Sequence, residues 1–462
     1  MSPLAVGTDP TWAHGIGGAK DLPISPELAI TGAMAALVVS FAVLALAWRS
    51  PRYAPAGRPR TVRLSPQTSR LLLGVGTTVG RVVGFALFAY VVLIAVAGED
   101  LLTNPFFGIF YVWWWVGLIP LSLLLGPAWR AMSPARTLNL GLAKIAGNDP
   151  EVGVFSYPER LGHWPAAFGL FAFVWMELVY PFSTELSPVR LWCALYLGAM
   201  VVGGALFGNT FFARADPFEV FSTLVGHLSV WGREDAQTGE PAETGSLVLR
   251  SPLANLATVV PRPGLVAVGA VLFGSTAFDS FKDSSHWVQF IQGHDALNTS
   301  YWANAAANNL ALIAFCLAVG LLIALGTMLT GVGPDQPRRA LPAAFAHSIV
   351  PIIVGYFVAH YLTYFLEVGQ ATLVQVSDPF GTGANWFGTA NLTVSYFFSD
   401  HPTLLADIKV AAVVVGHVVG VVAAHDRAIS LLPRRHQVTG QLSLLLVMVA
   451  FTAGGLYLLF SA

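Results

Sequence analysis

One segment of this sequence carries a row of side chains that can move protons or hold ions. In AHSIVPIIVGYFVAHYLTYFLEVGQ, the residues Tyr356, His360, Tyr364 and Glu367 recur at spacings of four, four and three. These spacings place side chains on one face of an α-helix. An imidazole titrates near neutral pH and binds metals in its neutral form. We therefore predict a site for water activation, proton relay or ion coordination, with His360 and Glu367 as reacting groups and the two tyrosines lining the pocket.

Three carboxylic acids in other apolar stretches are expected to belong to the same site. Ionisable groups in hydrocarbon cost several kcal/mol unless they are partnered, so each one is a functional candidate. Asp279 and Asp407 are predicted to act with His360 and Glu367 as catalytic groups, and Glu177 is predicted to line the substrate pocket.

Histidines also suggest a cofactor. His347, His360 and His417 are the predicted metal ligands, with a divalent ion as the candidate. A pair of stacked haems fits badly, because the 13 residues from His347 to His360 leave the two side chains about 140° apart around a helix. One haem or one metal ion between His347 and His417 stays an alternative. Pro351 lies four residues after His347 and should kink that helix.

The elements that hold these residues are predicted to be membrane-spanning helices. Of the 462 residues, 55% are hydrophobic and only 11% are charged, against about 25% charged in soluble domains. A bilayer core needs about 20 apolar residues per helix. The sequence predicts an all-α, polytopic bundle of about ten transmembrane spans, near 28–48, 71–97, 108–127, 165–183, 189–212, 264–282, 304–331, 341–366, 403–425 and 440–461.

The distribution of positive charge predicts the orientation of the bundle, because positively charged loops stay in the cytoplasm. The segment 49–70 contains six arginines and no acidic residue, which places it inside and both termini outside. All but five of the 24 Lys and Arg residues then fall in cytoplasmic segments. The five exceptions are Lys20, Arg81, Arg190, Lys282 and Lys409.

These spans predict the domain organisation. Residues 1–27 form an extracytoplasmic N-terminal segment, and 28–461 form a single transmembrane bundle. The cytoplasmic loop 213–263 and the outer loops 283–303 and 367–402 are the long connections. Aromatic side chains are expected at the membrane interfaces, with Trp113, Trp114 and Trp115 at the outer one.

Several classes of function are excluded. The net charge of −1 gives no attraction to nucleic acid. No phosphate-binding glycine loop, nucleophile elbow or His-Glu-x-x-His helix occurs. The two cysteines, Cys193 and Cys316, stand in apolar runs and are expected to be packed thiols rather than a disulfide. The expected partners are the lipid bilayer and an apolar small molecule or an ion.

A set of segments resembles a known family. They are WAHGIGGAKDLPI, GPAWRAMSP, FFARADPFEVFS, FGSTAFDSF, AHSIVPIIVGYFVAHY and VVGHVVGVVAAHDRA. Together they look like the multi-span bacterial membrane proteins commonly labelled fenitrothion hydrolase, over nearly the whole chain. The resemblance implies a plasma-membrane enzyme that hydrolyses the aryl ester bond of organophosphorus triesters.

Two functions from different classes therefore stay open. In the first, the protein is a metal-assisted hydrolase with an outer-leaflet pocket formed by the acids, tyrosines and His360. In the second, it is a transporter or accessory protein that passes a metal ion or protons along buried His, Asp and Glu residues. The native substrate and the oligomeric state are not encoded in any motif.

Overall fold

The computed structural model describes residues 21–54, 59–101, 103–235, 237–330, 332 and 337–461. Most of the predicted segment 1–27 lies outside these residues. The described chain is a multi-pass helical bundle, in agreement with the predicted all-α class. Eight of its helical segments are long and apolar enough to cross a membrane: α1 (Pro26–Ala47), α2 (Pro66–Ala97), α8 (Leu186–Phe207), α12 (Leu265–Lys282), α15 (Tyr301–Met328), Arg338–Gln375, α19 (Pro402–Leu431) and Thr439–Ser461, which contains η8 (Thr439–Gln441) and α20 (Leu442–Ser461).

The other two predicted spans also coincide with apolar helices, but they are irregular. The third is broken into α3 (Pro105–Phe107), the π-helix η3 (Gly108–Val116) and α4 (Leu118–Leu125), with a bend of 41° before α4. The fourth is α7 (Trp164–Leu178), which has 15 residues. A straight span needs about 20 residues, so the number of crossings depends on these two segments.

The eighth predicted span changes its helical geometry along its length. It runs through η4 (Arg338–Ala340), α16 (Leu341–Phe345), η5 (Ala346–Ile349), α17 (Val350–Thr363), the π-helix η6 (Tyr364–Val368) and α18 (Gly369–Gln375). The 3₁₀ turn η5 ends immediately before α17, whose second residue is Pro351. The irregularity predicted at this proline is therefore present.

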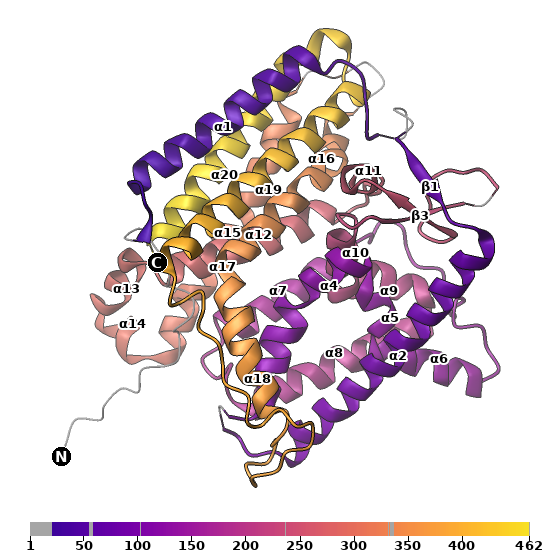
Figure 1. Ribbon diagram of the computed structural model, residues 1–462, viewed down its shortest axis with the longest axis vertical. Helices are drawn as coiled ribbons and strands as arrows, with labels where there is room; N and C mark the ends of the chain where they lie inside the picture. Colours follow the sequence, from indigo (N-terminus) through magenta and orange to yellow (C-terminus); the bar gives the residue numbers. More distant parts are fainter. Residues whose placement is uncertain are drawn as a thin grey trace.

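Spans eight and nine pack closely, as the sequence predicts. α17 packs against α19, and two glycines of α19 lie at the contact. A Cβ added to Gly416 would lie 2.6 Å from the carbonyl oxygen of Pro351, and one added to Gly420 would lie 2.7 Å from the carbonyl oxygen of Ser348, so neither position has room for a side chain. Such small residues allow two helix backbones to approach. α12 packs against α17, α15 and α7, and α1 packs along α19 and α20 (Figure 1).

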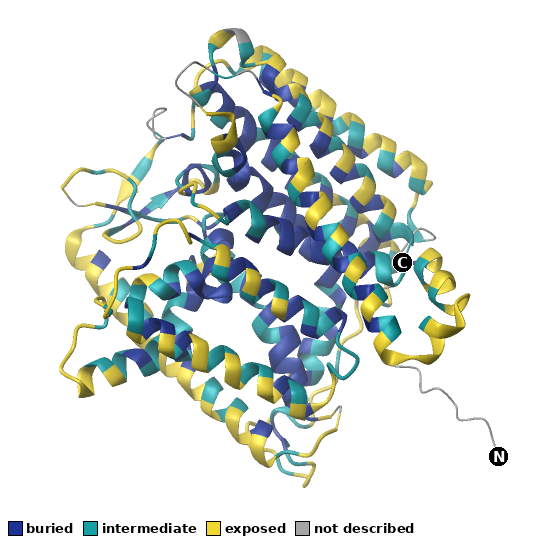
Figure 2. Ribbon diagram, turned by 180° about the vertical axis from the view of Figure 1, so that it is seen from behind, coloured by how far each residue is buried: buried dark blue, intermediate teal, exposed yellow. Residues whose placement is uncertain are grey.

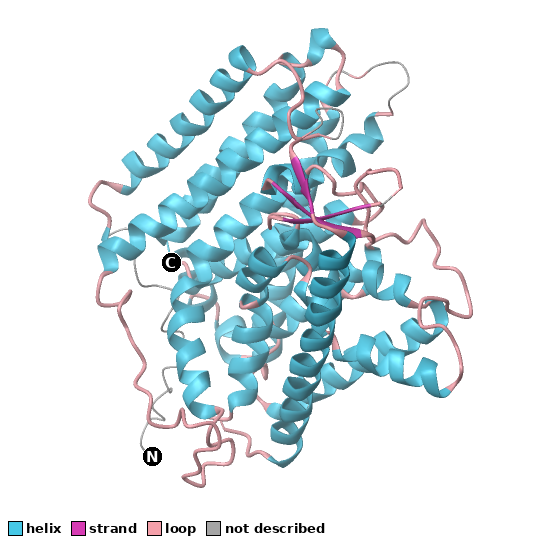
Figure 3. Ribbon diagram, turned by 45° about the vertical axis from the view of Figure 1, so that its right-hand side comes forward, coloured by secondary structure: helices cyan, strands magenta, loops and turns pink. Residues whose placement is uncertain are grey.

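A small antiparallel sheet closes one end of the bundle. β1 (Thr61–Arg63), β3 (Ser246–Arg250) and β2 (Trp231–Glu234) pair in that order. β1 comes from the predicted cytoplasmic segment 49–70 and the β2–β3 hairpin from 213–263, so two distant segments meet at one face. The sequence analysis missed this sheet. We call this face the sheet end; Figure 3 shows its strands in magenta.

Short helices complete both ends of the bundle. The sheet end also carries α5 (Ala128–Met132), α6 (Pro134–Ile145), α9 (Asn209–Ala215), α10 (Pro217–Gly226), α11 (Pro252–Leu256) and η7 (Arg434–His436). The opposite end, which we call the loop end, carries α13 (Ser285–Gln292), α14 (Asp295–Thr299), α18 and the segment 376–401. The C-terminus lies beside α13 in Figure 1, and His286 Nε2 is 3.5 Å from the hydroxyl of Tyr457.

The surface of the bundle is apolar where it would face lipid. Val75, Val79, Val82 and Val83 of α2 are all exposed, and exposed positions line the outer helices in Figure 2 while buried positions gather where helices meet. Exposed valines in such numbers are expected of a surface that contacts hydrocarbon rather than water.

The expectation that Trp114 and Trp115 anchor the outer interface is wrong. Trp115 is buried against Phe173, Phe221 and Phe357. Trp114 stacks on Trp129 with ring centroids 5.2 Å apart. These rings pack in the core because the third span is broken and lies inside the bundle, where aromatic side chains fill the space between helices.

Candidate functional site

His360 lies in a buried cluster with Asp279, one of its predicted partners. Its Nε2 is 2.8 Å from Asp279 Oδ2, and both side chains are almost fully buried. Asp279 stands one turn before the end of α12 and His360 stands in α17, so the packing of these two helices creates the pair. A buried carboxylate beside an imidazole satisfies the requirement that intramembrane charges be partnered.

The cluster continues on the other side of the imidazole. His360 Nδ1 is 3.2 Å from Ser280 Oγ, which is 3.1 Å from the hydroxyl of Tyr356. That hydroxyl donates to the carbonyl oxygen of Gly455 in α20 at 3.4 Å. Asp279, His360, Ser280 and Tyr356 thus form one chain of hydrogen-bonding groups between α12 and α17, and Gly455 connects it to a third helix, α20.

This chain satisfies both protonation states of His360. When the imidazole is neutral with its proton on Nε2, Nδ1 accepts a hydrogen bond from the Ser280 hydroxyl. When the imidazole is charged, Nδ1 donates to Ser280, whose hydroxyl turns to donate to Tyr356, which donates to Gly455. The Ser280 hydroxyl therefore rotates with each protonation step. The charged state makes one hydrogen bond more than the neutral state, and all four side chains stay hydrogen-bonded in both.

Two further groups contact the same carboxylate. The hydroxyl of Tyr361 donates to Asp279 Oδ2 at 2.9 Å. Lys282 Nζ lies 3.8 Å from Asp279 Oδ1, and its side chain is 30% exposed. Lys282 is the last residue of α12, at the loop end, so its side chain lies between the buried carboxylate and the surface. The sequence analysis singled out neither Tyr361 nor Ser280, although both are sequence neighbours of predicted residues.

Tyr364 lies within electrostatic range of two acids, Asp279 and Glu177. The helix becomes a π-helix at Tyr364, which changes the direction of the side chains that follow. Tyr364 and Tyr111, from the two π-helices η6 and η3, lie within electrostatic range of Glu177. π-Helical turns occur often at functional sites.

Glu177 is a second acid of this region, and its side chain is half-buried. Its Oε2 atom is buried and has no hydrogen-bond partner among the described residues. It lies within electrostatic range of Asp279 and Lys282. The structure therefore places two carboxyl groups on facing helices, α7 and α12, in the half of the bundle that is nearer the loop end.

The other two predicted catalytic acids lie elsewhere. Glu367 is buried and accepts a hydrogen bond from Ser399, which ties η6 to the segment 376–401. Asp407 is exposed on α19, and the structure gives it no contact with His360. The predicted grouping thus holds for Asp279 and fails for Glu367 and Asp407.

The predicted metal ligands do not converge. His347 Nδ1 faces the carbonyl oxygen of Ala344 at 3.2 Å, and His417 Nδ1 faces that of Val413 at 2.8 Å. Within the described part of the chain, no three His, Cys, Asp or Glu side chains come together as they would around a metal ion. His417 Nε2 is buried without a hydrogen-bond partner in the same residues.

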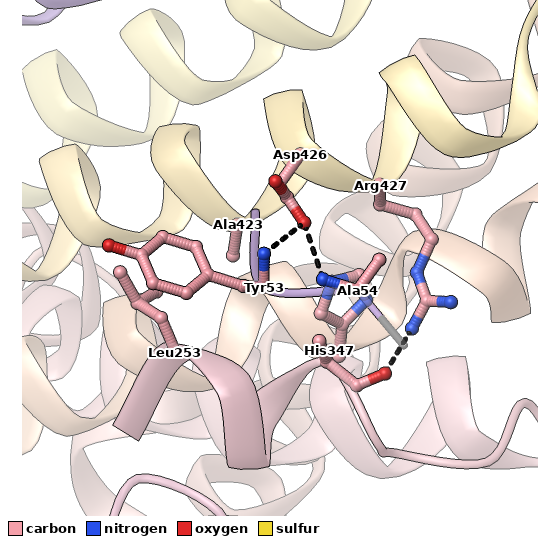
Figure 4. A pocket seen from close by; sticks show the side chains of 8 residues that line it. Tyr53, Ala54, Leu253, His347, Ala423, Asp426 and Arg427 are labelled. Carbon is pink, nitrogen blue, oxygen red and sulfur yellow. Dashed lines mark hydrogen bonds between the residues drawn. The ribbon is translucent and has the colours of Figure 1, made fainter. Parts of the chain in front are cut away.

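His347 lies instead beside a group of hydrogen-bonded polar residues at the sheet end (Figure 4). It lines a small space of about 10 Å³ with Asp426 and Arg427, enough for about one water molecule. The carboxylate of Asp426 accepts hydrogen bonds from the backbone N–H groups of Arg52, Tyr53 and Ala54, at 2.6 to 3.1 Å. Asp426 thereby holds the segment between α1 and α2 against α19.

A second polar network lies at the sheet end. Asp216 caps α10 and accepts hydrogen bonds from Trp129 Nε1 at 3.1 Å and the Tyr196 hydroxyl at 2.9 Å. Arg136 of α6 binds Glu219 of α10 through two nitrogens, Nε to Oε2 at 2.5 Å and Nη2 to Oε1 at 2.7 Å. Burial, followed by the nearby Glu219 carboxylate, raises the pKa of Asp216 to about 7, although its hydrogen bonds oppose this shift.

The raised pKa of Asp216 predicts a pH-dependent stability. The folded protein keeps this proton over a pH range in which the unfolded chain has lost it, so stability falls as pH rises from the ordinary value of 3.8 toward about 7. We expect Asp216→Asn, which cannot titrate, to flatten this dependence by an amount on the order of a few kcal/mol. Thermal unfolding in detergent between pH 4 and about 8 measures it. Asp149→Asn, at an exposed sheet-end residue, is the control, and equal slopes in wild type and Asp216→Asn would contradict the prediction.

The fold and these networks define a class: an all-α, multi-pass membrane protein whose polar residues are gathered in buried clusters between helices. No family model, no curated protein and no solved structure matches the chain. The likeness to proteins labelled fenitrothion hydrolase therefore stays a prediction.

Proposed function

We propose that this protein moves protons at the Asp279–His360 pair, as part of a proton-coupled transport or accessory function in the membrane. One observation carries the proposal: the chain Asp279–His360–Ser280–Tyr356 accommodates both charge states of the imidazole while all four side chains stay hydrogen-bonded. Buried titratable groups of this kind are typical of proton relays in membrane proteins. Lys282, partly exposed beside Asp279, supports an entry from the loop end.

A pH jump applied to proteoliposomes on a solid-supported membrane tests this proposal. Proton binding at a buried site displaces charge across the bilayer, so wild-type protein should give a transient current that empty liposomes lack. The absence of any such current at neutral pH would contradict a titrating buried site.

Aryl phosphotriester hydrolysis is a second candidate, and one observation favours it. The order Ser280–His360–Asp279 is that of a nucleophile, a base and an orienting acid. However, Ser280 is fully buried, and neither the small space beside His347 nor a groove at Tyr180 is lined by these three residues. Release of a nitrophenol by purified protein, lost in Ser280→Ala, would favour the hydrolase over the proton relay.

We further propose ten crossings of a bacterial plasma membrane, with the sheet end in the cytoplasm. The connections after the first, third, fifth and ninth predicted spans meet at the sheet end through β1–β3, Arg136–Glu219 and Asp426. These connections contain most of the Lys and Arg residues, and positive loops stay inside. The loop end, with both ends of the described chain, then faces outward.

Cysteine labelling tests this orientation. In a background without Cys193 and Cys316, a membrane-impermeant maleimide added to intact cells should label Asn391→Cys in the outer segment and leave Asn148→Cys unlabelled. Both positions are exposed, so permeabilised cells provide the control in which both react. Labelling of Asn148→Cys alone in intact cells would reverse the topology.

A further inference from the structure

A groove at the loop end combines one positive and one negative side chain with an apolar wall. It has a volume of about 640 Å³ and lies where α7 ends and α8 begins, lined by Tyr180, Glu185, Arg190 and Leu191 among others. Pockets for small ligands have volumes of about 300–1,000 Å³. The groove is therefore large enough for a headgroup and the first part of an acyl chain.

The two charges of the groove are available to a ligand. Glu185 is exposed and makes no side-chain hydrogen bond or ion pair with any described residue. Arg190 is exposed too and donates one hydrogen bond, from Nη1 to the carbonyl oxygen of Ala95 at 2.9 Å. That bond holds the guanidinium in place and leaves its other donors for an anion. The two side chains stand five residues apart and form no ion pair with each other.

The groove continues into the lipid-facing surface. Leu191 is 59% exposed and Leu195, one turn further along α8, is 66% exposed. Tyr180 packs near Phe182 and Trp302, whose rings are 5.7 and 6.4 Å from its own. Aromatic rings of this kind collect at the level of lipid headgroups, which places the two charges at headgroup depth.

We propose that this groove binds a zwitterionic phospholipid with a primary ammonium headgroup, of the phosphatidylethanolamine type. The phosphate lies on Arg190, the ammonium on Glu185 and one acyl chain along Leu191 and Leu195. An anionic lipid satisfies only Arg190 and is repelled by Glu185, so the two charges together select the zwitterion. This proposal depends on membrane insertion and is independent of the proton relay.

Native mass spectrometry of the protein in detergent, with phosphatidylethanolamine or phosphatidylglycerol added, tests the site. Wild type should retain one phosphatidylethanolamine at least tenfold more tightly than phosphatidylglycerol. Glu185→Gln should reduce this preference several-fold, Arg190→Gln should abolish retention of the bound lipid, and Arg190→Lys should restore part of it. Arg70→Gln, at an exposed residue near the sheet end, is the matched control.

Two results would overturn the proposal. One is an unchanged ratio of the two lipids in Glu185→Gln, a variant at an exposed residue without partners that should fold normally. The other is retention in Arg190→Gln equal to that in Arg70→Gln. Thermal unfolding of each variant separates loss of the lipid from loss of the fold, and Glu185→Gln alone decides the headgroup selectivity if Arg190→Gln does not fold.

Discussion

Replacing Asp279 with Asn, or His360 with Gln, should abolish the charge displacement that a pH jump produces in wild-type proteoliposomes. His360→Gln keeps hydrogen-bonding groups near Ser280 and Asp279 but removes the imidazole that would carry the proton. Asp279→Asn removes the charge that stabilises the imidazolium 2.8 Å away, and an imidazolium without this partner is costly in a buried site. Each variant alone should therefore lose the whole signal rather than half of it.

The controls separate proton binding from folding. Asp295→Asn removes an exposed carboxylate at the loop end and should leave the current unchanged. Tyr361→Phe removes one donor to Asp279 and should shift the pH at which the current is half-maximal while keeping its size. A wild-type current in both His360→Gln and Asp279→Asn, at normal expression and melting temperature, would contradict the proposed relay.

The site could be predicted from the sequence where a single helix determines it. Tyr356 and His360 are four residues apart in a regular α-helix, which predicts a shared face, and in the structure both contact Ser280. Depth made Asp279 a candidate partner, because a buried histidine requires a polar partner, but it selected Asp407 equally. Ser280 was not predictable, because a serine in an apolar helix is usually a packing residue.

The prediction failed where the helix geometry changes. The segment Tyr364–Val368 is a π-helix, and Glu367 within it accepts a hydrogen bond from Ser399 rather than joining the His360 cluster. The π-helix at Gly108–Val116 likewise accompanies the burial of Trp115. Periodicity assumes 3.6 residues per turn, and nothing in the apolar residues of these segments signals the π-helices.

The predicted spans and the missed sheet differ in how far the local sequence determines them. All ten predicted spans coincide with helical segments because the length of an apolar run is a local property. β1 and β3 are only three and five residues long and are separated by 182 residues from Arg63 to Ser246 in the sequence. Their pairing is determined by the bundle that brings the two segments together, which no local pattern of the strands encodes.

The largest loss of stability is expected from Arg136→Ala. Arg136 and Glu219 form a two-nitrogen ion pair in which the side chains are only 10% and 2% exposed. Removing the arginine leaves the Glu219 carboxylate buried without its partner, and breaking a buried pair in this way typically costs about 3–5 kcal/mol. The same guanidinium also donates to the carbonyl oxygen of Asn209 at 3.1 Å. The free energy of unfolding in mixed micelles measures the loss.

A second ion pair at the sheet end provides the matched comparison. Arg214 lies 3.3 Å from Glu159, whose side chain is 80% exposed. Exposed pairs contribute about 0–1 kcal/mol because water and salt screen them, so Glu159→Ala should change stability little. The double variant Arg136→Ala with Glu219→Gln should recover much of the loss, since a neutral amide is less costly to bury than an unpaired carboxylate. Equal effects of Arg136→Ala and Glu159→Ala would mean that the Arg136–Glu219 pair contributes little to the stability of the sheet end.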